Sequence, residues 1–324
     1  MSEARPVAVV IPSWNSLELL PRCLRSLRAQ AVEIELLVVD NGSVDGTPAL
    51  LEREGVARLR LPRNLGFAPA VNRGVSETAA PAVLVLNADT ALEPGCLKLL
   101  LAALDRDPGL AGVQPRILQL EASAGASGSV ADARLYSAGQ ALTRDGRAYE
   151  EGAGEAQPAA ALAGHEVFGV CGAACLLRRE WFERLGGYDE SYFAFYEDVD
   201  LNVRARIAGG RFAYVPEAVV WHVGNASWSA GFERPGAENA RLVARNRLAT
   251  QVKFMPAAAL PRIAAVELGA LARAARQRRL LATLRGKLGV LPWLPRLWRE
   301  RRRLRREGDL GAARRWLGAR APGA

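Results

Sequence analysis

The chain has 324 residues, half of them apolar, which is enough for one large domain or two ordinary ones around a sizeable core. Its four cysteines are scattered and it has only two histidines, so the composition argues against a disulfide framework or a protein held together by zinc. Cys171 and Cys175 are interpreted as small buried residues, with a metal or redox pair as the alternative. The N-terminal MSEARP leads directly into an apolar stretch without a hydrophobic leader, which predicts residence in the cytoplasm.

The net charge of +9 is concentrated towards the C-terminus. Residues 273–324 contain 16 of the 43 Lys and Arg residues but 3 of the 34 Asp and Glu residues, so residues 1–272 are slightly acidic. The stretch LGVLPWLPRLWRERRRLRR mixes Trp293, Trp298 and leucines with arginines, a pattern typical of segments that lie on an anionic membrane surface. A solvated basic helix and an RNA-binding tail are the alternatives.

We therefore predict that the tail binds peripherally to the inner face of the cytoplasmic membrane. We expect no binding of nucleic acid. Charged residues interrupt every long apolar run, so no spanning helix is expected. The sequence makes no prediction of the oligomeric state.

Short apolar runs alternate with amphipathic stretches over the first 115 residues. We expect strands at residues 7–11, 35–40, 57–61 and 82–87, with helices at 16–29, from 47, at 67–76 and from 94. This alternation predicts an α/β fold with a doubly wound, mostly parallel sheet, in which the ligand site lies outside the carboxyl ends of the strands.

Polar residues follow each of these four strands, so we expect them to face one crevice. They are Pro12, Ser13 and Asn15; Asp40, Asn41, Gly42 and Ser43; Arg63, Asn64 and Gly66; and Asn87 and Asp89.

The rest of the chain is less regular. Residues 121–163 are rich in Ala, Gly and Ser and are interpreted as a surface excursion, either a hairpin or a flap over the site. Beyond it we expect a strand at 165–179, helices at 180–185 and 198–208, strands at 212–216 and 218–222, and a helix at 238–254. The domain would span 1–255, followed by a basic, amphipathic helical tail at 256–324.

Two aspartates at strand ends are candidate ligand-binding residues. Asp40 is well placed to accept hydrogen bonds from a nucleotide base or ribose, although it also suits an ordinary strand-to-helix turn. Asp89 ends the run VLVLNADT, where its carboxylate could bind Mg2+ or Mn2+ and, through the ion, a diphosphate. Capping of the helix near Pro94 is the alternative for Asp89.

Three acids occur together in YEDVDL, at Glu197, Asp198 and Asp200. They fall in the first turn of a predicted helix, where any one of them would favourably oppose the helix dipole. The aromatic residues just before them would raise the pKa of a neighbouring carboxyl, as a general base requires.

Several motifs occur in the order found in one enzyme family: VVIPSWNS, VVDNGSVDGT, RNLGFAPAVNRGV, VLVLNADT, the long stretch from GAACLLRREWF to VVWHVGNAS, and ARNRL. Over residues 5–255 the chain resembles the family 2 glycosyltransferases of the GT-A fold, in particular their rhamnosyltransferase-like branch. The resemblance implies an inverting hexosyltransferase that moves a sugar from a nucleoside diphosphate to an acceptor hydroxyl. Its branch suggests L-rhamnose from dTDP-rhamnose, and a lipid-linked or cell-surface glycan as acceptor.

The resemblance also assigns roles to individual residues. It makes Asp198 the general base, with Glu197 orienting it or the acceptor, and leaves Asp200 as an acid that serves the helix. The residues implied in donor binding are Pro12, Trp14, Asn15, Asp40, Arg63, Asn64, Gly66, Asn87, Asp89 and Arg247, although Arg247 also suits an ordinary surface charge. Asp89 and His222 would hold Mg2+ or Mn2+, although Asn87 replaces the first acid of the family's usual Asp-x-Asp, and His222 also suits an ordinary strand end.

Two other classes of protein share part of this pattern. A sugar-1-phosphate nucleotidyltransferase also uses a doubly wound sheet, but it expects a Gly-rich loop after the first strand, where this chain has PSWNSLELLP. A non-catalytic membrane- or RNA-binding module would rest on the arginine tail alone.

Overall fold

In the computed structural model of the chain, residues 6–120, 129–157, 163–224 and 235–318 are described. The helices run in chain order as α1 (Leu20–Arg28), α2 (Thr47–Arg53), α3 (Phe67–Ser76), α4 (Cys96–Arg106), α5 (Arg179–Arg184), α6 (Glu197–Ile207), α8 (Pro235–Phe254), α9 (Leu260–Arg276), α10 (Leu280–Leu288), α11 (Leu294–Glu307) and α12 (Leu310–Arg314). Short 3-10 turns occur at η2 (Glu190–Tyr192), η3 (Ala257–Ala259) and η4 (Leu291–Trp293).

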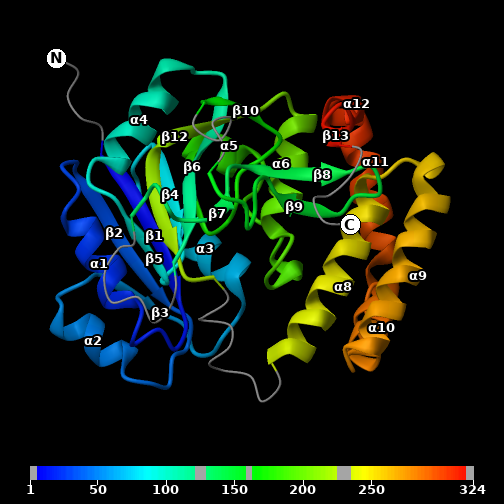
Figure 1. The fold of residues 1–324 in the computed structure, drawn as a ribbon, viewed down its shortest axis with the longest axis horizontal. Coiled ribbons are helices and arrows are strands. Elements are labelled where there is room, and N and C mark those ends of the chain that lie inside the picture. The colour runs from blue at the N-terminus through cyan, green and yellow to red at the C-terminus, as the bar shows by residue number, and fades with distance from the viewer. Residues whose placement is uncertain (1–5, 121–128, 158–162, 225–234, 319–324) are drawn as a thin grey trace.

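A large mixed sheet forms the centre of the molecule (Figure 1). Its main path is β10 (His165–Val167), β12 (Arg211–His222), β6 (Leu110–Gln119), β11 (Ala174–Arg178), β4 (Ala82–Leu86), β1 (Val7–Ser13), β2 (Ile34–Asp40) and β3 (Arg58–Arg60), with β5 (Thr90–Leu92) on β12 and β7 (Leu135–Ser137) on β6. Strands β4, β1, β2 and β3 are parallel, and β12 and β6 are parallel, whereas β11 joins the two groups by antiparallel pairing. The predicted mostly parallel, doubly wound sheet is thus confirmed.

Alternate residues of β1 explain how helices come to cover both faces of the sheet. Val7, Val9 and Ile11 pack in the core cluster that contains α1 and α4, whereas Ala8 and Val10 pack in the cluster that contains α3. Successive side chains of a strand point to opposite faces, so an uninterrupted apolar run supplies both cores.

Two of the expected strands differ in the structure. The single strand expected at 165–179 is two strands, β10 and β11, because the chain turns at residues 168–173 between them. The two strands expected at 212–216 and 218–222 are one, β12, which keeps pairing with β6 past Pro216 through a register shift between Val215 and Val219. A shift of this kind accommodates a proline, which cannot donate to the ladder.

Strands also form within the weakly patterned segment 121–163. Besides β7, it contains β8 (Gln140–Thr143) and β9 (Ala148–Glu150), which form an antiparallel hairpin, and β13 (Leu317–Gly318) pairs with β8. The parts of the expected excursion at 121–128 and 158–162 lie outside the described residues.

The C-terminal helices pack against the α/β body. Helices α8 to α11 lie side by side, away from the β3 edge of the sheet (Figure 1). Leu297 and Leu304 of α11 are buried, and Arg301 donates to the carbonyls of Val252 and Met255 at the end of α8. No helix of the described segments combines the length and hydropathy that a bilayer span requires.

Candidate active site

Two adjoining cavities lie at the carboxyl ends of β1, β2 and β4. The smaller, of about 50 Å³, is lined by Pro12, Ser13, Trp14, Asn41, Asn64, Phe67, Asn87 and Ala88. The larger, of about 280 Å³, shares Phe67 and Asn87 with it and reaches Asp89, His222, Glu197 and Asp198. Six of the twelve strand-end residues expected to face one crevice line these cavities: Pro12, Ser13, Asn41, Asn64, Asn87 and Asp89.

Asp40 ends β2 and is fully buried. Its Oδ1 accepts a hydrogen bond from the Ser43 amide at 2.9 Å, whereas Oδ2 has no hydrogen-bond partner among the described residues. The Arg60 Nε lies 3.8 Å from Oδ2. A buried carboxylate oxygen without a donor is costly unless a ligand supplies one, which suits the base-binding role implied for Asp40.

The loops after β1 and β2 are tied together by side-chain amides. Asn15 accepts from the Val44 amide at 3.0 Å, and Asn41 donates to Asn64 Oδ1 and to the Gly66 carbonyl, both at 3.0 Å. Gly66 has φ +105°, and a Cβ there would lie 2.5 Å from the Phe193 carbonyl oxygen. Glycine is therefore required at position 66 for the loop to approach the aromatic segment before α6.

Asp89 and His222 lie together although 133 positions separate them. Antiparallel pairing of β5 with β12 places His222 opposite Thr90, and its Nε2 is 3.1 Å from Asp89 Oδ1. Asn87 Nδ2 is 3.3 Å from the same ring nitrogen, and Tyr136 packs edge-on against the ring. Asp89 Oδ1 and His222 Nδ1 are buried without hydrogen-bond partners among the described residues.

These donors fit a divalent cation. A carboxylate oxygen and an imidazole nitrogen face each other, and Asp89 Oδ1 lacks the hydrogen bond that a buried acceptor normally has. Asn87 contributes no carboxylate, so the two acidic or imidazole ligands from the protein are Asp89 and His222. Diphosphate oxygens and water would fill the remaining coordination positions of the ion.

Asp198 lies in the first turn of α6, on the wall of the larger cavity. Its Oδ2 accepts from the Gly172 amide at 2.9 Å and from Gln140 Nε2 at 3.1 Å, and its Oδ1 accepts from the Val199 amide at 2.7 Å. Burial raises the pKa of Asp198, and these hydrogen bonds limit the rise. The carboxyl is thus held rigidly, with a pKa moved in the direction a general base needs.

Glu197 is buried beside Asp198 and also lines the larger cavity. Burial, together with the charge of Asp198, raises the pKa of Glu197 well above its ordinary value. The neighbouring carboxyls therefore have different environments: Asp198 accepts backbone hydrogen bonds, whereas Glu197 Oε2 has no partner among the described residues.

The aromatic segment before α6 has an unusual backbone. Phe193, Phe195 and Tyr196 all have φ between +66° and +70°, in the left-handed region that non-glycine residues avoid. Asn246 of α8 is fully buried, and its Nδ2 donates to the carbonyls of Tyr192, Ala194 and Phe195 at 2.7–2.9 Å. The asparagine of the motif ARNRL therefore holds the chain in the conformation that delivers Asp198 to the cavity.

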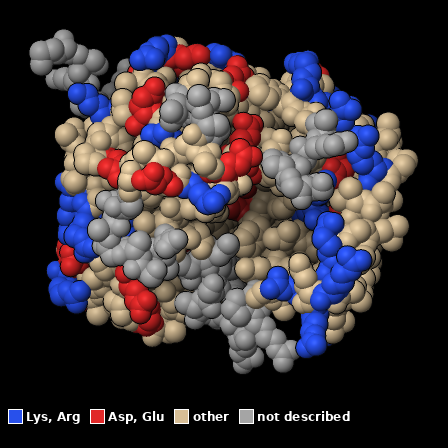
Figure 2. Space-filling view, viewed as in Figure 1, with Lys and Arg blue, Asp and Glu red and all other residues tan. Residues whose placement is uncertain are grey.

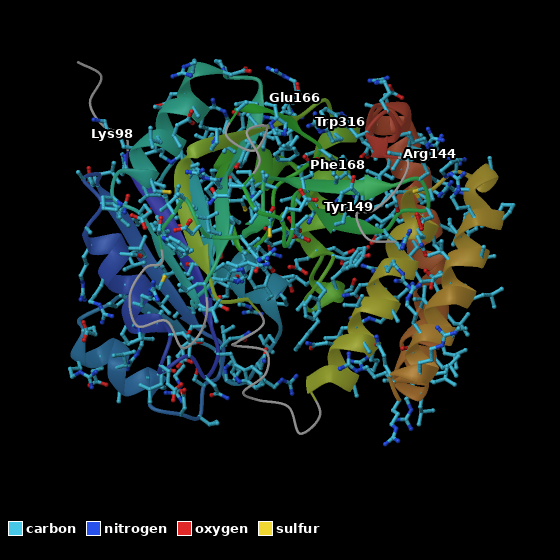
Figure 3. The ribbon with its side chains drawn as sticks, in the orientation of Figure 1. Lys98, Arg144, Tyr149, Glu166, Phe168 and Trp316 are labelled. Carbon is cyan, nitrogen blue, oxygen red and sulfur yellow. The ribbon has the colours of Figure 1, made fainter. Side chains whose placement is uncertain are left out.

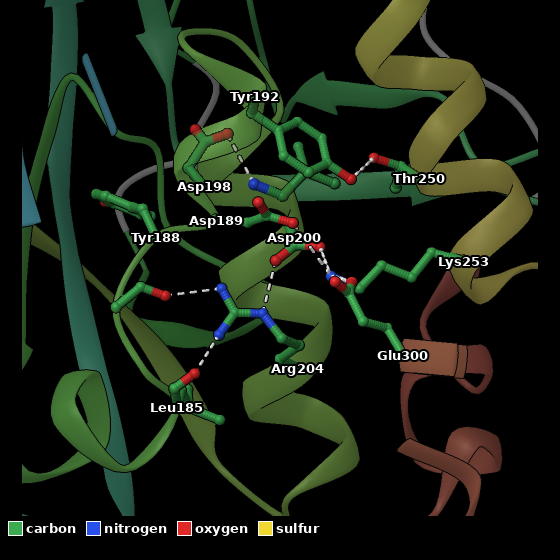
Figure 4. Close-up of polar contacts among 12 residues, drawn as sticks. Leu185, Tyr188, Asp189, Tyr192, Asp198, Asp200, Arg204, Thr250, Lys253 and Glu300 are labelled. Carbon is green, nitrogen blue, oxygen red and sulfur yellow. Dashed lines mark hydrogen bonds and ion pairs between the residues drawn. The ribbon is translucent and has the colours of Figure 1, made fainter. Parts of the chain in front are cut away.

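Asp200 points away from the cavity into a buried network of charges (Figure 4). It accepts from Arg204 Nε at 2.6 Å and from Lys253 Nζ of α8 at 2.7 Å. Lys253 Nζ also lies 2.8 Å from Glu300 of α11. Asp200 therefore does more than oppose the dipole of α6, because it fixes α6 to α8 and, through Lys253, to α11.

Five of the ten residues implied in donor binding line neither cavity: Asn15, Asp40, Arg63, Gly66 and Arg247. Arg63 is exposed and lines neither cavity, although its backbone packs against Gly42. Arg247 also lines neither cavity, and its Nε is 2.8 Å from Glu267 of α9.

The segment at 121–163 supplies cavity residues that the sequence did not indicate. They are Tyr136 of β7, Gln140 of β8, and Ala148, Tyr149 and Glu150 of β9. Figure 3 shows Tyr149 in the middle of the molecule, on the β8–β9 hairpin. Their surroundings in the sequence have no periodic pattern, so strand pairing brings them to the site: β7 pairs with β6, and β8 pairs with β9.

The cavity-lining residues thus lie at the carboxyl edge of a doubly wound sheet, where open α/β sheets bind their ligands, with Asp198 on the wall of the larger cavity. Residues 8–186 match the family model for glycosyl transferase family 2. The chain belongs to that family, which confirms the expected enzyme class.

Relatives support a narrower resemblance. The N-acetylglucosaminyl-diphospho-decaprenol L-rhamnosyltransferase of Mycobacterium tuberculosis H37Rv is 32% identical over 244 residues, which cover 68% of this chain and 76% of the relative. A pre-mycofactocin glycosyltransferase of the same organism is 32% identical over 221 residues, which cover 67% of this chain and 43% of that protein. The resemblance to the rhamnosyltransferase-like branch is confirmed.

Solved structures show the GT-A fold. GalNAc-T7 with UDP, GalNAc and Mn2+ has a TM-score of 0.56 at 18% identity, covering 76% of this chain and 48% of that one. The mannosyltransferase PcManGT of Pyrobaculum calidifontis with GDP-Man and Mn2+ has a TM-score of 0.51 at 20% identity, covering 97% and 87%. Residues 1–349 of S. aureus TarS with UDP-GlcNAc give 0.53 at 16% identity, covering 95% and 87%. The predicted fold class is thereby confirmed.

Proposed function

We propose that this chain transfers a sugar, with inversion, from a nucleoside diphosphate to a hydroxyl of a lipid-linked glycan. The relative named as a rhamnosyltransferase suggests dTDP-L-rhamnose as donor and an N-acetylglucosaminyl-diphospho-lipid as acceptor. The observation that carries the proposal is the placement of Asp198 and the Asp89–His222 pair on the walls of one cavity.

The reaction follows from this arrangement. The nucleoside occupies the smaller cavity, which Trp14 lines, and the diphosphate lies towards Asn87, Asp89 and His222. Asp40 ends β2 next to Asn41, which lines the smaller cavity, and is the proposed partner of the nucleotide base. Mg2+ or Mn2+ bound by Asp89 and His222 would offset the negative charge that develops on the departing diphosphate. Asp198 takes the proton of the acceptor hydroxyl as its oxygen bonds to the anomeric carbon. The bond between that carbon and the diphosphate breaks, the configuration inverts, and the proton leaves Asp198 for water.

A donor screen tests this assignment. We expect dTDP-L-rhamnose, among a panel of nucleotide sugars, to raise the melting temperature, and Mn2+ or Mg2+ to increase the shift, because a ligand that binds only the native state stabilises it by mass action. Transfer to an N-acetylglucosaminyl-diphospho-lipid, followed by mass spectrometry, would complete the test. Absence of stabilisation by every nucleotide sugar, together with absence of transfer, would contradict the proposal.

The metal site has its own test. We expect Asp89→Ala and His222→Gln to abolish the extra stabilisation that Mn2+ gives to the nucleoside diphosphate complex, because each removes one of two protein ligands. Thermal shifts with dTDP in Mn2+ and in EDTA measure the effect, and the ligand-free melting temperature controls for damage to the fold. A metal-dependent shift that survives in both variants would place the metal elsewhere.

We also propose that the C-terminal helices contact an anionic membrane surface at the inner face of the cytoplasmic membrane. Eight of the eleven exposed large hydrophobic side chains of the described residues lie between positions 260 and 298: Leu260, Leu268, Leu280, Leu281, Leu284, Leu288, Leu291 and Trp298. Lys and Arg gather on the same side of the molecule, over α8 to α11 (Figure 2). Exposed leucines surrounded by cations suit acyl chains bordered by anionic headgroups.

The proposed contact includes helices that precede the stretch indicated by the sequence. Trp293 packs between the guanidinium groups of Arg245 and Arg296, and Leu297 is buried. Within LGVLPWLPRLWRERRRLRR, Trp293 and Leu297 therefore pack on the protein, whereas Leu288, Leu291 and Trp298 are exposed. These three side chains extend the proposed membrane contact that the other exposed leucines of α9 and α10 begin.

We expect Leu281→Ser/Leu288→Ser to reduce binding to vesicles of phosphatidylglycerol and phosphatidylcholine at least about tenfold, because two leucines would lose their burial in the acyl layer. Flotation of the full chain with these vesicles measures it, and Leu99→Ser on α4 is the matched control. Equal flotation of the double variant and the wild type would contradict the proposed surface.

A further inference from the structure

The larger cavity has an acid that the reaction described above does not use. Glu150 ends β9 and lines the cavity together with Asp198, Tyr136 and Tyr149. Among the described residues Glu150 forms no ion pair, so its carboxyl faces the cavity without a cation. Its neighbour Glu151, by contrast, lies 3.7 Å from His165 and does not line the cavity.

Gln140 connects Glu150 to Asp198. Its Nε2 lies 3.1 Å from Asp198 Oδ2 and 3.3 Å from Glu150 Oε1, and its Oε1 accepts from Asn202 at 2.8 Å. These contacts fix the orientation of the Gln140 side-chain amide. Its Nε2, in turn, holds the carboxyls of Glu150 and Asp198 at a fixed spacing. Oxygen atoms of Glu150 and Asp198 lie within 4.8 Å of each other. Two hydroxyls of one small molecule could thus reach both carboxyls at once.

The protonation of Glu150 suits a hydroxyl partner. Burial, and then the charge of Asp198, raise the pKa of Glu150 to about 7. Near neutral pH its carboxyl can therefore donate as well as accept, as a sugar hydroxyl can. Ser137 Oγ donates to Oε2 at 2.6 Å, so the side chain is held in place before any ligand arrives.

The remaining walls favour a ring-shaped ligand. Phe67, Tyr136, Tyr149, Phe195 and Tyr196 place aromatic side chains around the acids. Buried Glu197 lines the same space, and its Oε2 has no partner among the described residues. Aromatic walls with a few fixed polar groups are typical of sites for a ligand with both apolar and polar faces, such as a sugar ring.

We propose that Glu150 binds a second hydroxyl of the acceptor, next to the hydroxyl that Asp198 deprotonates, so that the acceptor group in this cavity is a sugar ring with neighbouring hydroxyls. The inference rests on the proposed transfer reaction and names the residue that recognises the acceptor's sugar ring. Glu150 is then a specificity-determining residue, and the hairpin β8–β9 is the part of the fold that selects the acceptor.

A cycle of variants and acceptors tests the contact. The acceptor is an N-acetylglucosaminyl-diphospho-lipid with a short prenyl chain, together with analogues that each lack one ring hydroxyl. We expect Glu150→Ala to raise the KM for the full acceptor roughly tenfold or more, the loss expected for a hydrogen bond to an ionisable group, with the donor KM unchanged. For one deoxy analogue, the wild type should show the same increase in KM that Glu150→Ala shows with the full acceptor. With Glu150→Ala, that analogue and the full acceptor should have the same KM. Glu151→Gln is the matched control and should behave as the wild type.

Two outcomes of this experiment would contradict the contact or the reaction on which it rests. If the increase in KM caused by Glu150→Ala multiplies with the increase caused by every deoxy analogue, the two changes act independently. Glu150 then does not contact an acceptor hydroxyl, and the proposal is wrong. If the wild type does not use this acceptor, the proposed reaction fails separately, and saturation-transfer NMR with a panel of methyl glycosides then decides on Glu150. Binding to the wild type that is lost in Glu150→Ala would uphold the contact, whereas equal binding, or none to either protein, would overturn it.

Discussion

Asp198→Asn is expected to reduce sugar transfer by roughly 10²–10⁴-fold while nucleoside diphosphate binding stays unchanged. The amide keeps the shape of the side chain and can still accept from the Gly172 amide, but it cannot take the acceptor's proton. Transfer rates with saturating donor and acceptor, and titration calorimetry with dTDP, would measure the two effects. Asp105→Asn, an exposed acid on α4, is the matched control. Transfer at the wild-type rate by purified Asp198→Asn would remove Asp198 from the role of base.

The same assignment fixes the sign of the pH dependence. A general base acts only when ionised, so the transfer rate should fall as pH decreases through the pKa of Asp198. Burial raises that pKa, so the fall should begin at a higher pH than for an ordinary aspartate. A transfer rate that stays constant down to the ordinary range of aspartate would contradict this environment.

Lys253→Met is expected to lower the free energy of unfolding by about 3–5 kcal/mol, because removing one partner leaves a buried charge uncompensated. Lys253 is almost fully buried, and its Nζ is 2.7 Å from Asp200 and 2.8 Å from Glu300. Urea denaturation followed by tryptophan fluorescence would measure the loss through the shift of the midpoint.

Arg303→Met on α11 is the control for that experiment. Arg303 pairs with Glu307 at 3.5 Å on the surface, where both side chains are exposed, and such a pair contributes about 0–1 kcal/mol. If the two variants unfold at the same urea concentration, the buried network of Lys253 does not hold α6, α8 and α11 together.

The first half of the fold could be read from the sequence because its signals are local. The apolar run at residues 7–11 and the helix predicted at 67–76 lie in β1 and α3, and the helix bounds agree with the prediction. Asp40, Asn87 and Asp89 follow directly from their strands, so the edge of the sheet that carries them was predictable from the direction of the strands.

The second half depends on contacts between distant segments. Pairing of β5 with β12 brings His222 to Asp89, and nothing near His222 in the chain indicates that partner. Asn246 is one polar residue among many on a helix, and its three carbonyl acceptors belong to a loop about 50 positions earlier. Composition likewise does not distinguish Leu297 of the basic tail, which packs against the protein, from Leu288, which is exposed.

The sequence by itself therefore determined the alternation of strands and helices, the family, and the acids that end the strands or begin α6, because periodicity and motif order are properties of neighbouring residues. Only the tertiary structure decided that Asp200 belongs to a buried network with Lys253, that Arg247 pairs with Glu267, and that β9 delivers Glu150 to the cavity. The physical reason is that a side chain's partners, burial and pKa depend on which surfaces pack together, and packing joins residues that are far apart in the chain.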